Sequence, residues 1–222
     1  MGIHPGRVEV TAVEIDPTLI PALQRTAELC RRCGDAEISI NVIQGDIINL
    51  SPKLNSIFDL IIINPPYKKL GALSPVRHTL VSLIWDAPNI YAAFISIGAD
   101  ALIPGGQLVA ITPRSFANGP YFGSFRKAFL RQMAIDRLHI FESRSSVFAD
   151  TGVLQENIVF SCTKNGVRGP VTIISSRDTE GVANEKVVPY SQVVEPTDPA
   201  QYIRVAIDGG AGGGECANDI SG

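Results

Sequence analysis

The 222-residue sequence contains no apolar run of the roughly 20 residues that a membrane-spanning helix requires. Its first ten residues have no apolar signal core, so we expect a cytoplasmic protein and no membrane partner. No G-x-G-x-x-G motif follows a strand-like segment, which argues against a nicotinamide-dependent enzyme. The glycine-rich stretch Gly209–Gly214 lies instead in a tail with few apolar residues.

Cysteine is scarce, with four in the chain. Cys30 and Cys33 form one C-x-x-C inside an expected helix, and no second pair follows. A structural zinc ion needs about four ligands, so we expect no metal site. Reduced thiols are the simpler interpretation.

The formal net charge is −3 and the isoelectric point is about 5.6, whereas a nucleic-acid-binding domain is usually basic. The charge is unevenly distributed, however. Residues 64–144 hold nine basic and four acidic side chains. A locally basic surface suits a polyanionic substrate, although a solvated charged surface gives the same count.

Strand-like and helix-like segments alternate along the chain. Such alternation predicts a mostly parallel sheet with helices on both faces, and ligands bind such sheets at the carboxyl ends of the strands. We expect strands at Val8–Ile15, Ile38–Gln44, Phe58–Ile63, Leu108–Thr112, Ile135–Phe141, Asn157–Cys162 and Val171–Ser175, and helices at Pro17–Arg32, Ile90–Leu102 and Tyr121–Met133. The continuous apolar run Phe58–Ile63 is typical of a strand buried on both faces.

Composition changes near the carboxyl end of the chain. We expect one α/β domain over residues 1–175 and a flexible glycine-rich tail over residues 206–222. Residues 176–205 are polar and punctuated by proline. They read as a connector or as the start of a further unit.

The sharpest motif is Asn64-Pro65-Pro66-Tyr67, directly after the apolar run. An exocyclic amine is a poor nucleophile because its lone pair is delocalised into the ring. Two acceptors, the Asn64 side-chain oxygen and the Pro65 carbonyl, can bind its two N–H groups and expose that lone pair. Proline fixes the backbone, and the Tyr67 ring can stack on a flat base. The alternative is a plain turn, for which Asn-Pro and Pro-Pro are common dipeptides.

This motif and its setting resemble the DNA N6-adenine methyltransferases of restriction–modification systems, in the gamma-ordered N-P-P-Y group. The resemblance covers about Val8 to Cys162. It implies an α/β, Rossmann-like sheet of an S-adenosylmethionine (SAM)-dependent methyltransferase, mostly parallel with an antiparallel edge strand and incomplete at the N-terminus. It also implies catalysis by Asn64, Pro65, Pro66 and Tyr67, with DNA as the partner.

The cofactor residues come from two further strand ends. Val13-Glu14-Ile15-Asp16-Pro17 resembles the acidic end that holds the SAM ribose, with Glu14 as the carboxylate. Gln44-Gly45-Asp46-Ile47 resembles the segment that binds the SAM adenine. The implied cofactor residues are Glu14, Ile15, Asp46, Ile47 and Asn64. Local interpretations stay open, because Asp16 before Pro17 suits a helix cap and Gly45-Asp46 suits a turn.

The remaining expected contacts are to nucleic acid. Ser146-Val147-Phe148 resembles a later motif whose aromatic ring stacks on a flipped base, so Tyr67 and Phe148 would form two walls around it. Phe148 is equally well explained as a core residue. Lys68, Lys69 and Arg114 are the expected contacts to DNA.

One part of the family pattern is not found. A glycine-rich loop that cradles the methionine end of SAM should precede Val8, and Met1–Arg7 cannot supply a strand, loop and helix. We therefore expect a missing segment or a partner chain to supply it, together with target recognition. Two alternatives remain open: an amino methyltransferase acting on RNA adenine or a protein glutamine, and an inactive fragment or partner-binding subunit.

Overall fold

The computed structural model describes residues 6–32, 37–67, 87–141, 157–176 and 183–205. Its strands are β1 (Arg7–Glu14), β2 (Glu37–Gln44), β3 (Phe58–Ile63), β4 (Leu102–Pro113), β5 (Met133–Phe141), β6 (Asn157–Lys164), β7 (Val171–Ser176) and β8 (Asn184–Val188). Its helices are α1 (Ile20–Arg32), α2 (Ile47–Leu50), α4 (Ile90–Ala101), α5 (Ser115–Asn118), α6 (Gly123–Gln132) and α7 (Tyr190–Val193), with short 3-10 turns η1 (Ser51–Lys53) and η2 (Pro120–Phe122).

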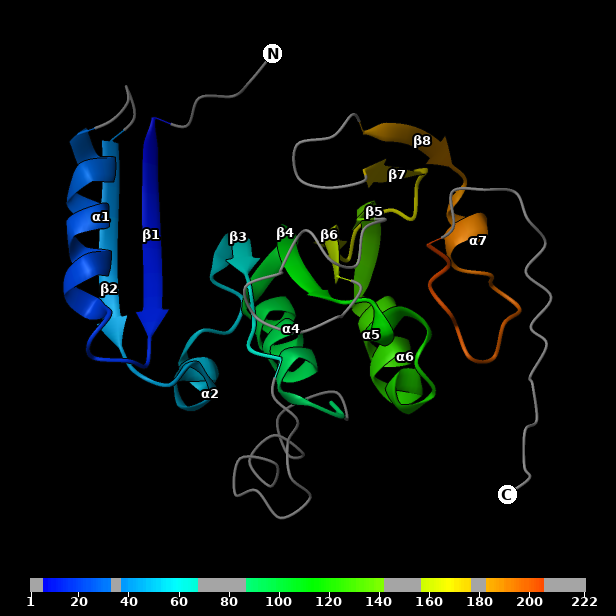
Figure 1. Ribbon diagram of the computed structural model, residues 1–222, viewed down its shortest axis with the longest axis horizontal. Helices are drawn as coiled ribbons and strands as arrows, with labels where there is room; N and C mark the ends of the chain where they lie inside the picture. Colours follow the sequence, from blue (N-terminus) through cyan, green and yellow to red (C-terminus); the bar gives the residue numbers. More distant parts are fainter. Residues whose placement is uncertain (1–5, 33–36, 68–86, 142–156, 177–182, 206–222) are drawn as a thin grey trace.

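The strands form two sheets, one of β1 and β2 and one in the order β3-β4-β6-β5-β7-β8 (Figure 1). The prediction of an α/β chain is confirmed. The pairs β1–β2, β3–β4 and β5–β7 are parallel, and β8 is an antiparallel edge strand. Strand β6 is also antiparallel to both of its neighbours but lies inside the sheet, which the sequence pattern did not reveal.

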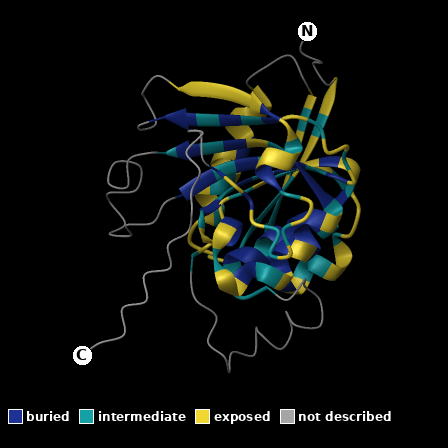
Figure 2. Cartoon of the chain, turned by 90° about the vertical axis from the view of Figure 1, so that its right-hand side faces the viewer, coloured by how far each residue is buried: buried dark blue, intermediate teal, exposed yellow. Residues whose placement is uncertain are grey.

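Helices α4, α5 and α6 lie on one face of the six-stranded sheet (Figure 1). Alternate residues of β4 point toward them, so Leu108, Ala110 and Thr112 are buried while Val109 and Ile111 are half-buried. Figure 2 shows the buried residues concentrated in this sheet and on the helices beside it. The core of the described chain is therefore the layer between this sheet and these helices.

Helix α4 is apolar on nearly every side, which is typical of a buried helix. The Asn89 side chain accepts from the Ala92 N–H at 3.0 Å and caps its first turn. At the other end the buried Lys164 ammonium donates to the Asp100 and Leu102 carbonyls, at 3.1 and 2.7 Å. The Asn89 cap and the Lys164 contacts therefore hold the two ends of α4. Its first turn lies beside the Asn64–Tyr67 motif.

The prediction that Phe58–Ile63 is buried on both faces is wrong. Ile61 and Ile63 pack toward α4, but Leu60 and Ile62 on the opposite face are 52% and 73% exposed. The reason is that, within the described residues, nothing covers that face of β3, and its edge away from β4 is unpaired. An apolar run shows that a strand can be buried on both faces. It does not show whether other elements pack against both faces.

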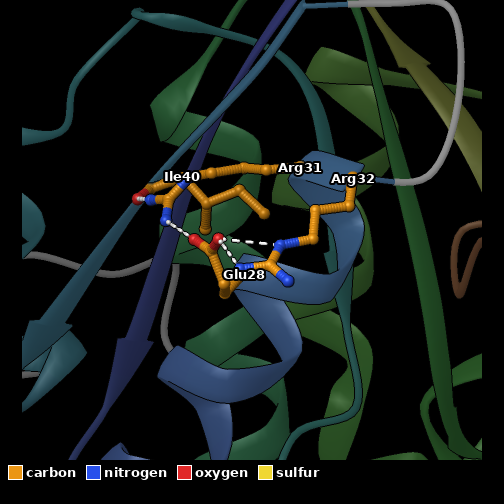
Figure 3. A network of polar contacts seen from close by, with 4 residues as sticks. All are labelled: Glu28, Arg31, Arg32 and Ile40. Carbon is orange, nitrogen blue, oxygen red and sulfur yellow. Dashed lines mark hydrogen bonds and ion pairs between the residues drawn. The ribbon is translucent and has the colours of Figure 1, made fainter.

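The two edges of the smaller sheet differ in their contacts. At the outer edge, the Arg31 guanidinium from α1 donates to the Ile40 carbonyl of β2 at 2.7 Å and also pairs with Glu28 (Figure 3). Glu28 holds Arg32 as well, at 2.9 Å. Strand β1 lies on the side of this sheet nearer to β3 (Figure 1), and both of these inner edges lack a partner strand among the described residues.

The segment after β7 packs into the main core. Val188, Val193, Ile203 and Val205 are buried in the same cluster as residues of α4, α5 and α6. The domain limits expected from composition, 1–175 and 176–205, stay a prediction. Among the described residues, no helix is both long and apolar enough to cross a membrane.

Arg126 on α6 joins this last segment to the rest of the fold. Its side chain is 1% exposed and donates to the carbonyls of Phe116, Gly119 and Ala200, the closest at 2.8 Å. Its guanidinium also lies 4.8 Å from the centre of the Tyr202 ring. Burial lowers the pKa of the Arg126 guanidinium, and these acceptors offset that cost.

We expect Arg126→Met to lower the free energy of unfolding by about 2 kcal/mol, because it leaves buried carbonyls without donors. Urea unfolding followed by circular dichroism measures this change. The matched control is Lys127→Met, one position along α6 and exposed, which should stay within about 0.5 kcal/mol of wild type. Equal loss in both variants would contradict a specific role for Arg126.

Candidate functional site

The carboxyl ends of β3 and β4 lie side by side because the two strands are parallel, with Ile63 opposite Ala110. Asn64–Tyr67 follows β3 directly. The Tyr67 hydroxyl lies 3.4 Å from Asn64 Oδ1 and 3.5 Å from the Ile111 carbonyl of β4. The motif therefore folds back over the end of the neighbouring strand.

Exposure alternates along the motif. Asn64 and Pro66 are exposed, Pro65 is buried and Tyr67 is half-buried. The buried Pro65 anchors the turn, so the exposed Asn64 amide is presented from a rigid backbone. The contact between Tyr67 and the Asn64 oxygen is long enough to be weak, so an incoming amine can replace it.

Tyr91, on the first turn of α4, lies behind the motif. Its ring meets the Tyr67 ring edge-on, with centres 6.4 Å apart at 85°. Its opposite neighbour is Phe122 of η2, stacked at 5.5 Å. The Tyr91 hydroxyl lies 2.8 Å from Ser115 Oγ on α5. Tyr91 thus contacts both loops that follow β3 and β4.

Burial raises the pKa of Tyr91 to about 12, with the hydrogen bond to Ser115 acting in the opposite direction. Burial also raises the pKa of Tyr67 above its usual range. Both hydroxyls are therefore protonated at neutral pH. The site offers neutral donors and acceptors here, without a charged phenolate.

A pKa raised in the folded state stabilises the protein below pH 10, the ordinary tyrosine value, and this contribution is lost as the pH rises toward about 12. We expect the free energy of unfolding of wild type to fall over that window more steeply than that of Tyr91→Phe. Urea unfolding at several pH values between 8 and 11 measures both slopes. Identical slopes would mean that Tyr91 ionises equally easily in both states.

The carboxyl ends of β1 and β2 form the second part of the site. The Gly45 N–H donates to the Glu14 carbonyl at 2.9 Å, which brings Glu14 beside the Gly45-Asp46 turn. One Glu14 carboxylate oxygen accepts from the Asp16 N–H at 2.8 Å. The neighbouring Ile15 is 65% exposed, an apolar side chain next to a carboxylate.

Both aspartates of this region have local roles. Asp16 accepts from the backbone and hydroxyl of Thr18, at 2.8 and 2.7 Å, and these bonds lower its pKa. Asp46 caps α2 by accepting from the Ile48 N–H at 2.9 Å. Asp16 therefore lies in a turn that precedes α1, which begins only at Ile20, and it does not cap that helix. Asp46 is a helix cap where the sequence left a plain turn open. A cap uses one carboxylate oxygen of Asp46, and the other makes only a 3.4 Å contact with Asn49.

Helix α2 connects this part to the catalytic motif. Ile48 is buried against Ala93 and Ile97 of α4, with Ile47 and Phe94 packed at the border of the same cluster. Because Tyr91 lies on the first turn of α4, the Asp46 turn and the Asn64 motif rest on one helix. The structure thereby brings the predicted cofactor and catalytic residues to the same end of the chain's strands.

Some predicted contacts lie outside the described residues: Lys68, Lys69, Phe148 and Cys33. Arg114 is described, and it stands half-buried between β4 and α5 at the site end of the sheet. Cys30 is exposed on α1. Among the described residues, no group of three or more histidine, cysteine or acidic side chains could hold a metal ion.

Tyr91 and Ser115 were not singled out from the sequence as site residues. The segment Asn89–Phe94 attracted attention only as a helix after the motif. The available signal was the tyrosine at the start of a largely apolar helix, since a buried hydroxyl needs a partner. That partner comes from a loop 24 positions further along, which spacing alone does not indicate.

A family model described as Eco57I restriction-modification methylase matches residues 24–148. This span covers more than half of the chain and includes the Asn64–Tyr67 motif. The chain belongs to the Eco57I restriction-modification methylase family. The predicted resemblance to restriction–modification methyltransferases is confirmed.

This chain is similar to two curated relatives over most of its length. It is 34% identical over 213 residues to the Type II methyltransferase M.PstI of Providencia stuartii, covering 89% of this chain and 41% of that protein. It is 35% identical over 212 residues to the Type II methyltransferase M.BsuBI of Bacillus subtilis, covering 90% and 42%. The chain thus spans less than half the length of either relative.

A solved structure supports the fold. The type IIG restriction endonuclease BpuSI superposes with a TM-score of 0.58 at 17% identity, over 82% of this chain and 21% of that one. The prediction of a Rossmann-like methyltransferase fold is confirmed.

Proposed function

We propose that this chain carries the catalytic motif of a SAM-dependent methyltransferase that methylates the exocyclic amino group of adenine in DNA. The observation that carries the proposal is the placement of Asn64–Tyr67. In a restriction-modification methylase, an exposed amide and a half-buried aromatic ring stand together at the carboxyl end of β3. The N-P-P-Y sequence supports an amino group as the target, and its resemblance to adenine enzymes supports adenine.

In this mechanism the side chains position the amine and supply no strong base. The Asn64 oxygen and the Pro65 carbonyl accept its two N–H groups, which favours a pyramidal nitrogen with an exposed lone pair. The Tyr67 ring stacks on the base. The methylated amine is acidic and releases its proton to water. Tyr67 gives up its long contact with Asn64 and keeps the Ile111 carbonyl as an acceptor.

The strand ends beside the motif fit the nucleoside half of SAM. Glu14 has a carboxylate oxygen beyond the one held by Asp16, which suits the ribose hydroxyls, and the exposed Ile15 and half-buried Ile47 offer apolar surface for an adenine ring. Asp46 has one oxygen left beyond its cap. Bound SAM would supply the methyl group on an electrophilic sulfonium.

The substrate class is tested by label transfer. The protein, completed by the segment or partner chain that is expected to supply the SAM loop, is incubated with SAM labelled in its methyl group. Unmethylated duplex DNA, RNA and a glutamine-containing protein substrate are added in separate reactions. We expect label in DNA alone. Label in RNA or protein would favour the alternative amino methyltransferases, and no label with any partner would favour an inactive or partner-binding subunit.

We also propose that polypeptide outside residues 1–222 completes the sheet by adding a parallel strand between β1 and β3. Three features support this. Arg31 occupies the Ile40 carbonyl on the outer edge of β2, the inner edges of β1 and β3 are unpaired within the described chain, and Leu60 and Ile62 expose apolar side chains on one face of β3. Such a strand would also deliver the glycine-rich loop expected for SAM.

We expect Ile62→Glu to leave the stability of the isolated chain within about 0.5 kcal/mol, because Ile62 is already exposed, yet to abolish methylation in the completed protein. Val187→Glu on β8 is the control and should keep full methylation, since Val187 is 61% exposed at the opposite edge of the six-stranded sheet from β3. Full methylation by Ile62→Glu would exclude added polypeptide packed against this face of β3.

A further inference from the structure

We infer that Tyr91 is a positioning residue for the catalytic motif, and that Ser115 holds Tyr91 in turn. The catalytic consequence rests on the proposed function, whereas the positioning itself does not. Tyr91 touches no predicted substrate or cofactor position. It acts through Tyr67, whose ring it meets edge-on.

The hydrogen bonds of Tyr67 are too long to fix its ring. Contacts of 3.4 and 3.5 Å lie at the limit of hydrogen bonding and contribute little. An edge-to-face aromatic pair is favourable beyond the apolar area that it buries, and the geometry of this pair is well within the range for such contacts. Packing against Tyr91 is therefore the stronger of the two constraints on where the Tyr67 ring lies.

Tyr91 is itself held from three elements. The Asn89 cap fixes its place on α4, the Phe122 ring of η2 stacks on it at 19° between planes, and Ser115 of α5 bonds its hydroxyl. Only 3% of Tyr91 is exposed. A side chain confined in this way can transmit its position to Tyr67, because neither its ring nor its hydroxyl has free space.

This arrangement also ties the loop after β4 to the motif after β3. Ser115 directly follows Arg114, one of the expected DNA contacts. The path from Ser115 through Tyr91 to Tyr67 consists of one 2.8 Å hydrogen bond and one ring contact. The geometry of the motif therefore depends on the loop that is expected to meet the DNA backbone.

The first test needs no activity. The full chain is labelled with 3-fluorotyrosine, and its five tyrosine signals are assigned by single Tyr→Phe substitutions in 19F NMR. In Tyr91→Leu we expect the Tyr67 signal to broaden or split, because the ring loses its support. In Ser115→Ala we expect a shift of the Tyr91 signal with a smaller effect on Tyr67. A single Tyr67 signal of unchanged width in Tyr91→Leu would overturn the inference.

Phe160→Leu is the matched control. Phe160 is 2% exposed and its ring contacts are with Phe116 and Phe129, so this change loosens the same core without touching Tyr91. We expect both leucine variants to lower the melting temperature, but only Tyr91→Leu to alter the Tyr67 signal. The same alteration in Phe160→Leu would show a general loss of packing and would overturn the inference.

The second test is kinetic. In the methylating form of the protein, Tyr91→Leu should lower kcat about 10- to 100-fold while KM for SAM stays unchanged, as expected for a misplaced group near the reaction. Tyr91→Phe keeps the ring and should restore kcat to within about threefold of wild type. Equal kcat losses in Tyr91→Phe and Tyr91→Leu would contradict ring packing as the cause. If no form methylates any substrate, the proposed function fails, and the 19F measurement still decides the role of Tyr91.

Discussion

Asn64→Ala is expected to lower kcat for DNA methylation by at least about 100-fold, because it removes one of the two acceptors that bind the target amine. The loss should fall mainly on kcat, since the interaction with the amine matters most as the nitrogen becomes pyramidal. A rise in KM for SAM would report the implied contact of Asn64 with the cofactor. Steady-state kinetics with labelled SAM on the active form of the protein separates the two constants. Asn64 is exposed, so the fold should be unaffected.

Asn118→Ala is the control for this substitution. Asn118 is exposed on α5, in the segment that follows β4, so the same side chain is removed near the same end of the sheet without touching the motif. Its kcat should stay within about twofold of wild type. A loss of similar size in both variants, or full activity in Asn64→Ala, would contradict the role assigned to the Asn64 amide.

Glu14→Ala is expected to weaken SAM binding by at least about 100-fold. A carboxylate that accepts both ribose hydroxyls makes two charge-assisted hydrogen bonds, each contributing about 1.5–3 kcal/mol. Removing the side chain also frees the Asp16 N–H, which loosens the turn before α1. Calorimetric titration of the protein with SAM measures the change in Kd directly and requires no nucleic acid.

Glu9→Ala provides the comparison on the same strand. Glu9 lies on β1 and its exposed carboxylate pairs with Arg7, so it matches Glu14 in type without lying at the carboxyl end of the strand. SAM affinity should be unchanged, because an exposed ion pair of this kind contributes little. Equal affinity of wild type and Glu14→Ala for SAM would place the ribose elsewhere.

The sequence predicted the order of most elements and the position of the motif. Hydrophobic patterning located β3 at Phe58–Ile63 with the observed bounds, and it located α4 to within a residue. Both segments are long apolar runs with clear ends, namely Asn64-Pro65 after β3 and Asn89 before α4. Local signals of this strength are decided by nearby residues, so they can be recognised without knowledge of the fold.

Features that depend on residues distant in the sequence were harder to predict. The place of β6 inside the sheet depends on pairing with β4 and β5, neither of which its own pattern specifies. Strand β8 was missed because it is an exposed edge strand with a single buried residue, Val188. The exposure of Ile62 depends on what lies across the face of β3, which the run itself does not encode.

The proposed catalytic motif showed the same division. Asn64–Tyr67 could be proposed from the sequence because its residues are four consecutive positions. Tyr91 and Ser115 could not, because they meet Tyr67 only after α4 and the loop after β4 have packed against β3. In this chain the residues that position the motif come from distant parts of the sequence, whereas the residues of the motif itself are adjacent.

The most direct test of the central claim is the identity of the methylated nucleoside. Unmethylated DNA is treated with the protein and SAM, digested to nucleosides and analysed by mass spectrometry, with Asn64→Ala treated in parallel. The account predicts N6-methyladenine with the wild-type protein and its loss with Asn64→Ala. Methylated cytosine as the sole product, or equal N6-methyladenine from both proteins, would contradict it.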